Sequence, residues 1–278
     1  MGFNYPQGFS PQQGLDFAIN FCQQAYYQDY IFRGEKQSDG QPYVFTEPQH
    51  YEMMYEIWGI DEIWHEDQGT VPFGFVARER KTNNVVFAIR GTEGDIEWAE
   101  DLFESDQIAC PVANSKGLVH QGFGNIYETL TYQPATSNSL TPPAIGSGDK
   151  LSQVLSGTSA VSITGHSLGS ALATLLALDV ALNTKTPITQ IYTFASPRVG
   201  DPDFVTQYNG LVPADSYRIA NVWDIVPHTP PEILFTIDHE WHYQHVNSYC
   251  PVDGGETIDV VTSHGLAAYE AGLKKLLT

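Results

Sequence analysis

The pentapeptide Gly-His-Ser-Leu-Gly at residues 165–169 places a serine where it could act as a nucleophile. A β-rich run at residues 161–164 precedes it, and an apolar, helix-forming run at residues 171–178 follows it. A sharp turn between a strand and a helix exposes the serine hydroxyl at its apex, and the two glycines remove side chains that would block the close approach of strand and helix. We therefore predict that Ser167 is a nucleophile.

An acid that orients the base of such a serine must come from elsewhere in the chain. A serine hydroxyl is a weak nucleophile and needs a general base, which an acid holds in place. With a serine on this kind of turn, the acid follows it in the chain and a histidine follows the acid. Asp224 lies just beyond the strand-like run 217–220, where side chains at the carboxyl ends of parallel strands converge. Asp201 and Asp203, in a Gly/Pro-rich turn, and Asp238, in a polar loop, stay open as alternatives, because aspartate is also common in turns.

Five histidines after Asp224 are candidates for the base: His228, His239, His242, His245 and His264. The first is too close to Asp224 in the chain to pair with it easily. The next three are spaced three residues apart, but they lack the H-E-x-x-H pattern, and no cysteine or carboxylate set completes a metal site. We therefore predict no metal and no cofactor, and local packing or hydrogen bonding for these three side chains.

His264 has the most suitable position for the base. We predict a short loop at residues 262–265, between a strand-like run at 258–261 and a C-terminal helix at 266–277. A histidine on a late loop after a strand can reach the carboxyl edge of the sheet, where Ser167 and Asp224 are expected.

The remaining pattern predicts the elements that position these residues. Helices are expected over residues 15–32 and near 122–129, a hairpin from strands 73–78 and 85–89, and further strands over 188–195 and 216–222. Residues 133–149, rich in Pro, Ser, Thr and Gly, predict a surface loop rather than a domain boundary, because helix signals resume at 151–155. The alternation of strands and helices predicts a single α/β domain over residues 1–278, with a mainly parallel sheet and helices on both faces.

The charge of the chain excludes some classes of partner. Its 33 Asp and Glu residues outnumber 13 Lys and Arg residues, for a formal net charge of −20. That excess argues against nucleic acid and against strongly anionic membrane surfaces. We therefore expect a neutral substrate or a neutral interface. The alternative explanation of the charge is that it keeps the protein soluble, for example in salty surroundings.

Cysteines and targeting signals give little information about the compartment. Cys22, Cys110 and Cys250 are too few and too dispersed for a disulfide framework, and no C-x-x-C motif is present. The N-terminal residues show no basic stretch followed by an apolar one, so we expect no secretory signal peptide in this chain. The longest apolar run, 168–182, is short for a membrane span and contains Asp179, which favours a buried helix behind the serine.

Five segments together resemble the fungal-type class 3 lipases of the α/β-hydrolase fold. They are Arg90-Gly91-Thr92, the G-x-V-H-x-G-F pattern at 117–123, the serine pentapeptide at 165–169, the P-R-V-G pattern at 197–200 and the D-x-V-P-H pattern at 224–228. They fall in the family's order and, with the elements around them, span about residues 70–265, which is most of the chain.

This resemblance implies a serine carboxylic-ester hydrolase, in the first place a triacylglycerol lipase that works at a lipid–water interface. It implies Ser167 as nucleophile, Asp224 as acid and His264 as base, with an oxyanion hole from Thr92 and the backbone N–H of Leu168. The first alternative is a feruloyl-type esterase or phospholipase A1 on the same scaffold. The second is a non-catalytic lipase-like binding module.

The family also has a short helical lid directly after the oxyanion strand, which here corresponds to residues 93–103. Ile96, Ala99 and Leu102 fall on one face at helical spacing, with Phe103 beside them and acidic residues opposite. Trp98 would lie next to the gate. An ordinary amphipathic surface helix is the alternative interpretation of this pattern.

The chain departs from the family pattern at three points. Ser170 stands where the family commonly has a second glycine, and a small residue should still fit there. The loop at 133–149 interrupts a helix that is usually longer, which affects one pocket wall. The resemblance favours a secreted protein, but the cysteine pattern does not match the disulfides of secreted fungal members. Oligomeric state and acyl-chain preference stay open.

Overall fold

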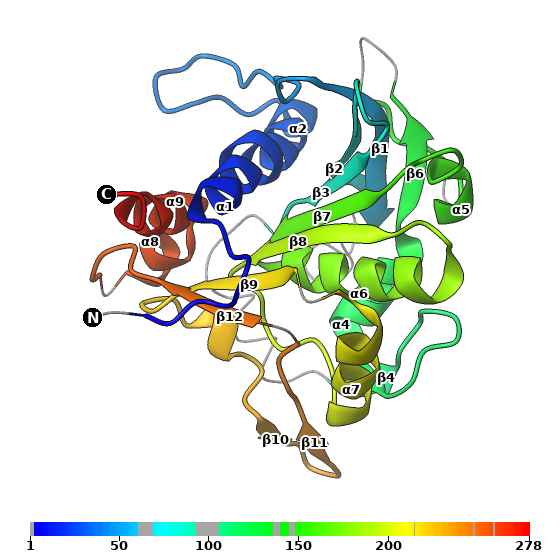
Figure 1. The fold of residues 1–278 in the computed structure, drawn as a ribbon, viewed down its shortest axis with the longest axis vertical. Helices are drawn as coiled ribbons and strands as arrows, with labels where there is room; N and C mark the ends of the chain where they lie inside the picture. Colours follow the sequence, from blue (N-terminus) through cyan, green and yellow to red (C-terminus); the bar gives the residue numbers. More distant parts are fainter. Residues whose placement is uncertain are drawn as a thin grey trace.

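An eight-stranded sheet forms the centre of the part of the chain that the structure describes (Figure 1). The computed structural model describes residues 3–60, 69–92, 106–135, 140–144, 148–213, 215–246, 248–257 and 259–278. In order across the sheet, the strands are β12 (Ser248–Val252), β9 (Ser216–Asn221), β8 (Ile188–Phe194), β7 (Val161–His166), β3 (Val85–Ile89), β2 (Thr70–Glu79), β1 (Tyr51–Ile60) and β6 (Thr131–Pro134). The first five are parallel to one another, and the later neighbours are antiparallel. The prediction of a mainly parallel central sheet is confirmed.

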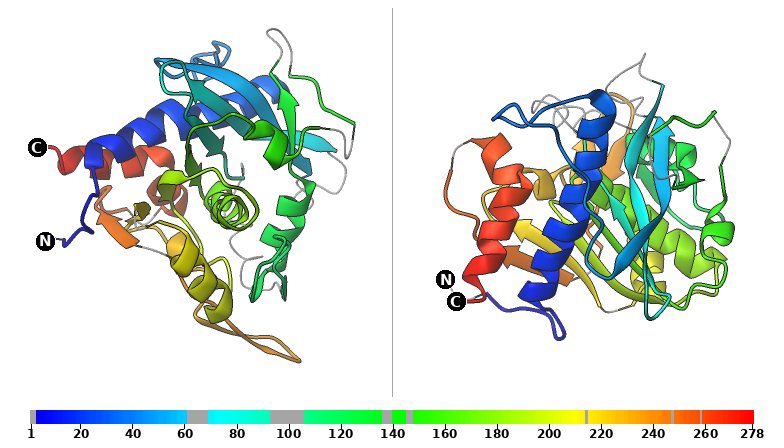
Figure 2. Two further views of the ribbon diagram at one scale, coloured as in Figure 1. Left: turned by 45° about the vertical axis from the view of Figure 1, so that its right-hand side comes forward. Right: turned by 90° about the horizontal axis from the view of Figure 1, so that it is seen from above.

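Helices cover both faces of this sheet, as predicted (Figure 2). On one face lie α1 (Pro11–Phe17), the π-helical turn η1 (Ala18–Cys22), α2 (Gln23–Arg33) and α9 (Leu266–Lys275); on the other lie α4 (Gln121–Thr129), α6 (Leu168–Asn183) and α7 (Pro202–Leu211). Successive side chains of a strand point to opposite faces. In β3, Val86 and Ala88 therefore pack in the cluster of the N- and C-terminal helices, and Phe87 and Ile89 pack in the cluster of α6.

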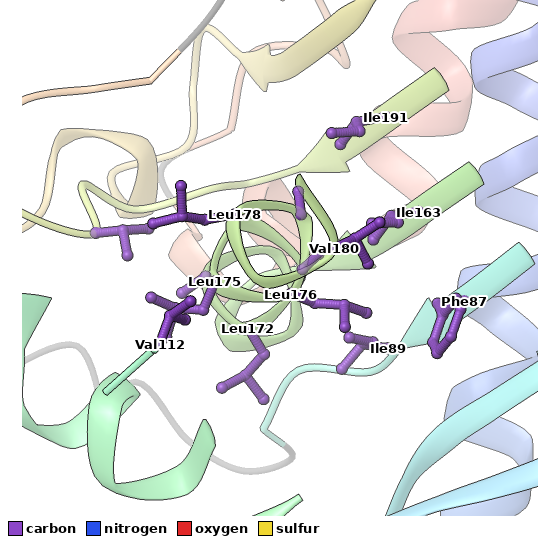
Figure 3. Packing of buried hydrophobic residues seen from close by; sticks show 14 of the residues in the cluster. Phe87, Ile89, Val112, Ile163, Leu172, Leu175, Leu176, Leu178, Val180 and Ile191 are labelled. Atoms are coloured by element: carbon purple, nitrogen blue, oxygen red, sulfur yellow. The ribbon is translucent and has the colours of Figure 1, made fainter. Parts of the chain in front are cut away.

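The helix α6 is buried along most of its length. Figure 3 shows Leu172 and Leu176 on the side of the helix that faces Ile89 at the end of β3. Asp179, the charge within this apolar run, accepts a hydrogen bond from the Tyr127 hydroxyl (2.8 Å). The predicted interpretation of residues 168–182 as a buried helix is confirmed, and the hydrogen bond explains how it tolerates a carboxylate.

The N-terminal helical segment extends beyond its predicted bounds of 15–32. It begins at Pro11, because the Ser10 hydroxyl caps it by accepting a hydrogen bond from the backbone N–H three residues on (3.3 Å). It ends at Arg33 and is followed by Gly34, whose φ of 71° is a conformation that favours glycine. The predicted hairpin, the helix near 122–129 and the strands over 188–195 and 216–222 are found as β2–β3, α4, β8 and β9.

The loop predicted over residues 133–149 begins with the last residues of β6, which pairs with β1. Residues 140–144 form neither helix nor strand, and residues 136–139 and 145–147 lie outside the described residues. A short helix, α5 (Leu151–Val154), follows.

The prediction of a strand at 258–261 and a loop at 262–265 is wrong. Residues Val260–His264 form the helix α8, and His264 is its last residue. The Asp259 carboxylate caps this helix by accepting hydrogen bonds from the Thr262 backbone N–H (3.2 Å) and from the Thr262 hydroxyl. The β-branched run of residues 260–262 is typical of a strand, but the cap decides in favour of a helix.

The strand that precedes α8 is β12, which sequence reasoning did not identify. It is short, it contains Pro251, and it lies at the edge of the sheet, where a proline is tolerated because its missing N–H faces away from the ladder.

Some predictions fall outside the described part of the chain. The structure does not describe residues 93–105. The lid hypothesis and its residues Ile96, Trp98, Ala99 and Leu102 therefore lie outside the described residues. Within the described ranges, none of the helices combines the length and the apolar character that a membrane span requires. All three cysteines are free thiols.

Two histidines in the core are held neutral by burial. Burial lowers the pKa of His120 and of His166 from the usual 6.5 to about 3. His120 stacks on Phe123 with ring centroids 4.4 Å apart, and both of its buried ring nitrogens are without hydrogen-bond partners in the described structure. An unfolded chain would bind protons at these rings more readily than the folded one.

We predict that acid destabilises the protein through these rings. Their folded pKa is depressed, so their contribution to stability is present above about pH 6.5 and is lost as the pH falls toward 3. Thermal unfolding followed by circular dichroism at pH 7, 6, 5 and 4 should show a falling midpoint. His120→Phe, which cannot take up a proton, should flatten this fall. The surface variant His50→Asn is the control and should follow the wild type; an equal fall in His120→Phe would contradict the prediction.

Candidate active site

Ser167 occupies a strained turn between β7 and α6. Its φ of 57° and ψ of −128° are unusual for a residue with a side chain. A Cβ on Gly165 would lie 2.2 Å from the carbonyl oxygen of Gly169, and a Cβ on Gly169 would lie 2.3 Å from that of Ile89. The prediction that both glycines permit the close approach of strand and helix is confirmed.

Ser170, the departure from the family's second glycine, ties this turn to the sheet. Its Oγ lies 2.7 Å from the carbonyl oxygens of both Gly165 and Phe194, and it accepts a hydrogen bond from the backbone N–H of Phe194 (3.2 Å). A small residue fits here, as expected. Its hydroxyl adds contacts to β7 and β8 that a glycine would lack.

The structure brings Ser167, His264 and Asp224 together. The Nε2 atom of His264 lies 2.9 Å from the Ser167 Oγ, and its Nδ1 atom lies 2.9 Å from the Asp224 Oδ2. The three residues come from the end of β7, the end of α8 and the segment after β9. A hydroxyl, an imidazole and a carboxylate in this order form the arrangement of a nucleophile, a general base and its orienting acid.

Asp224 is held in place by two further donors. It is buried, with 1% of its surface exposed. The Tyr269 hydroxyl donates to its Oδ2 (2.6 Å), and the Val226 backbone N–H donates to its Oδ1 (3.0 Å). Sequence reasoning did not identify Tyr269. It lies on α9, five residues after His264 and beyond the break between α8 and α9 at Gly265, so its contact with Asp224 comes from tertiary packing.

The alternative acids and histidines lie elsewhere. Asp201 caps α7 by accepting a hydrogen bond from the Phe204 backbone N–H (2.8 Å), and Asp203 and Asp238 are exposed. The other histidines make local contacts: His239 stacks on Trp241, His242 pairs with Glu240, and His245 contacts the Pro227 carbonyl. In the described ranges, no three His, Cys, Asp or Glu side chains are grouped so that they could hold a metal ion.

Two groups at the turn could stabilise negative charge on a substrate oxygen. Thr92 follows β3, which is paired in parallel with β7, and its buried Oγ1 is without a hydrogen-bond partner in the described structure. Leu168 is the first residue of α6, so its backbone N–H has no acceptor within the helix. The partial positive charge at the start of a 16-residue helix adds to this preference for an anion.

The arginine of Arg90-Gly91-Thr92 anchors the strand end and does not face the substrate. It is fully buried, and it donates to Asp29 of α2 (3.2 Å) and to the carbonyls of Pro72 (2.7 Å) and Gly91 (2.6 Å). Sequence reasoning missed Asp29. A carboxylate inside an otherwise apolar helix face was the signal, since a buried charge needs an opposite one.

A cavity of about 710 Å³ lies beside the triad, and Thr92, His166 and His264 are among the residues that line it. One wall is polar and aromatic and comes from α2 and the following loop: Gln23, Tyr26, Tyr27, Tyr30, Glu35, Gln37, Ser38 and Tyr43. The other lining residues are mainly apolar: Val226, Val260, Val261, Gly265 and Leu266. No Lys or Arg is among the described residues that line the cavity. It suits an uncharged molecule with an apolar part and a polar part.

Comparisons with known proteins agree with this geometry. A model of the family described as Lipase (class 3) matches residues 86–234, more than half of the chain. Phospholipase A1-II 3 of Oryza sativa subsp. japonica is 31% identical over 176 residues, which cover 58% of this chain and 42% of that protein. Phospholipase A1-IIgamma of Arabidopsis thaliana is 32% identical over 197 residues, which cover 63% and 45%. The chain thus spans less than half the length of these curated relatives.

Solved structures share the fold. Lip2 lipase from Yarrowia lipolytica has a TM-score of 0.62 at 21% identity, with 91% of this chain and 82% of that one covered. The triacylglyceride lipase of Rhizomucor miehei has a TM-score of 0.59 at 20% identity, with 90% and 83% covered. At such identities the likeness establishes the fold, which is that of the α/β-hydrolases. Together with the match of the family model, it shows that the chain belongs to the class 3 lipase family.

Proposed function

We propose that this protein is a serine carboxylic-ester hydrolase. The observation that carries the proposal is the chain of two 2.9 Å contacts from the Ser167 hydroxyl through His264 to Asp224. His264 takes the hydroxyl proton while the serine oxygen attacks the ester carbonyl carbon. The imidazolium then gives this proton to the leaving alcohol, which departs from the acyl-enzyme. Water, deprotonated by the same imidazole, releases the acid and restores the serine.

The negative charge that develops on the carbonyl oxygen needs donors already in place. We propose that the Thr92 hydroxyl and the Leu168 backbone N–H supply them. Among the described residues none forms a hydrogen bond with the buried Thr92 Oγ1, and this supports the role. Each donor of this kind typically contributes about 3 kcal/mol to transition-state stabilisation.

As substrates we propose uncharged acyl esters, with triacylglycerol first, met at a neutral lipid–water interface. The cavity's apolar lining residues and the absence of Lys and Arg from its described lining support this choice. The net charge of −20 also disfavours anionic surfaces.

Phospholipase A1 activity is the second candidate. The curated relatives at 31% and 32% identity carry that name, and this supports it. A phosphate group in the cavity would meet Glu35 and no described cationic side chain, which is why we place it second.

Replacing the nucleophile tests the reaction. We predict that Ser167→Ala lowers hydrolysis of p-nitrophenyl butyrate by about 10³-fold or more, because the acyl-enzyme cannot form. A fluorophosphonate probe should label the wild type at Ser167 and leave the variant unlabelled. The unfolding temperature should stay within a few degrees of the wild type. Turnover by the variant, or a wild type that resists the probe, would refute the mechanism; the latter would favour a non-catalytic binding module.

A substrate panel tests the specificity. Triolein emulsion, phosphatidylcholine vesicles and a feruloyl ester should be hydrolysed with the highest rate on triolein. A faster release of fatty acid from phosphatidylcholine, cleaved at sn-1, would replace the first candidate with the second. The Ser167→Ala variant measures the background for each substrate.

The cap of α8 gives a further prediction. Asp259→Ala removes the side chain that fixes the first turn of the helix ending in His264, so we expect kcat to fall several-fold with only a small loss of thermal stability. Asp201→Ala is the matched control, since it removes the equivalent cap of α7, which carries no residue of the triad. Equal kcat values for both variants and the wild type would show that the α8 cap does not position the base.

A further inference from the structure

A buried chain of hydrogen bonds runs behind the catalytic residues. The Gly91 backbone N–H donates to the Tyr26 hydroxyl oxygen (3.0 Å), and that hydroxyl lies 2.8 Å from the Nδ1 atom of His166. The Nε2 atom of His166 lies 2.9 Å from the backbone carbonyl oxygen of His264. Tyr26 is 9% exposed and His166 is 3% exposed, so both side chains are largely shielded from water.

Donor and acceptor can be assigned for every hydrogen bond in this series. The His264 carbonyl oxygen can only accept, so the His166 Nε2 carries the proton. Burial lowers the pKa of His166 to about 3, so the ring is neutral and its Nδ1 must accept. Burial also raises the pKa of Tyr26, so its hydroxyl keeps a proton to donate. The tyrosine oxygen is then free to accept from Gly91.

This hydrogen-bond chain joins three segments that each carry a group of the proposed site. Gly91 precedes Thr92, His166 precedes Ser167, and the carbonyl belongs to His264 itself. The packing here leaves no slack: a Cβ on Gly91 would lie 2.7 Å from the Tyr26 hydroxyl, from the His166 carbonyl oxygen and from the Ser167 Cβ. A shift of any one of the three segments would break a bond in the chain.

We propose that Tyr26 and His166 are positioning residues, which hold the oxyanion strand, the nucleophile turn and the base at their catalytic spacing. The proposal rests on the function proposed above. In this proposal α2 contributes no reacting group, but it places Tyr26 between Gly91 of the oxyanion strand and His166 of the nucleophile turn. A displacement of reacting groups by about 1 Å can cost about 100-fold in rate, so a small loosening is enough to matter.

The neutral state of His166 suits this position. Its ring centroid lies 4.8 Å from that of His264, which becomes a cation during the reaction. A second cation at that distance would oppose the proton transfer. The other titratable groups around His166 are Tyr26, Tyr269 and Asp224, and none of them adds a positive charge.

Removing the tyrosine hydroxyl tests the proposal. Tyr26→Phe should lower kcat 10- to 100-fold, leave KM within about threefold, and slow fluorophosphonate labelling of Ser167 in proportion. Tyr192→Phe is the matched control: it deletes a tyrosine hydroxyl from the buried core that contacts Gln13 (3.3 Å) and not the triad. Its kcat should equal that of the wild type. If Tyr26→Phe also retains wild-type kcat, or loses no more than Tyr192→Phe, the positioning role is overturned.

Variants of His166 separate positioning from packing. Gln can donate and accept through its amide as His166 does, whereas Phe keeps a ring and makes neither bond. His166→Gln should retain at least tenfold more kcat than His166→Phe, with similar unfolding temperatures. Equal losses in the two variants would show that the ring's shape, and not its hydrogen bonds, is what matters.

A measurement without substrate keeps this inference distinct from the proposed function. In protein labelled with ¹⁵N-histidine, NMR should show His166 as a neutral ring protonated at Nε2 from pH 5 to 8. The Nδ1 resonance should shift in Tyr26→Phe and stay in place in Tyr192→Phe. An Nδ1-protonated or charged His166 would overturn the chain even if the ester hydrolysis is real. If no ester is hydrolysed, the proposed function fails whatever this spectrum shows.

Discussion

The close contact between the end of β7 and the start of α6 is the constraint on which the site depends. Backbone atoms of Gly165, Gly169 and Ile89 lie nearer to one another than any Cβ would allow. That close approach is stabilised by the Ser170 hydroxyl. It forces Ser167 into a left-handed conformation and places its hydroxyl oxygen at the carboxyl end of β7. The strain is local and is offset by a helix that is buried along most of its length.

The opposite face of the sheet supplies the counterpart of this contact. On α2, Asp29 binds the buried Arg90 and Tyr26 binds Gly91, so one helix fixes two successive residues after β3. A buried ion pair adds little net stability compared with an apolar pair. Its value here is geometric, because the proposed oxyanion hole requires Thr92 to lie at one place relative to Ser167. The turn is thus held from α6 on one face and from α2 on the other.

The sequence predicted the parts that depend on local pattern and left out those that depend on distant partners. The strand–turn–helix around Ser167, the hairpin β2–β3 and the apolar α6 follow from periodicity and glycine placement. The segment before His264 was misread, because the β-branched residues 260–262 favour a strand until the Asp259 cap is considered. Tyr26, Asp29 and Tyr269 were not predicted, since the role of each depends on a buried partner far away in the chain.

The order of the strands affects when Ser167, Asp224 and His264 come together during folding. Ser167, Asp224 and His264 follow β7, β9 and the edge strand β12. Within the described sheet, β12 pairs with β9, some thirty residues earlier in the chain. Parallel pairings of this kind bring together distant parts of the chain and form slowly. His264, the proposed base, also follows Ser167 and Asp224 in the sequence, so it is synthesised after both. A ribosome-bound or truncated chain would carry its serine without the means to use it, and the appearance of a reactive serine would mark the completion of the fold.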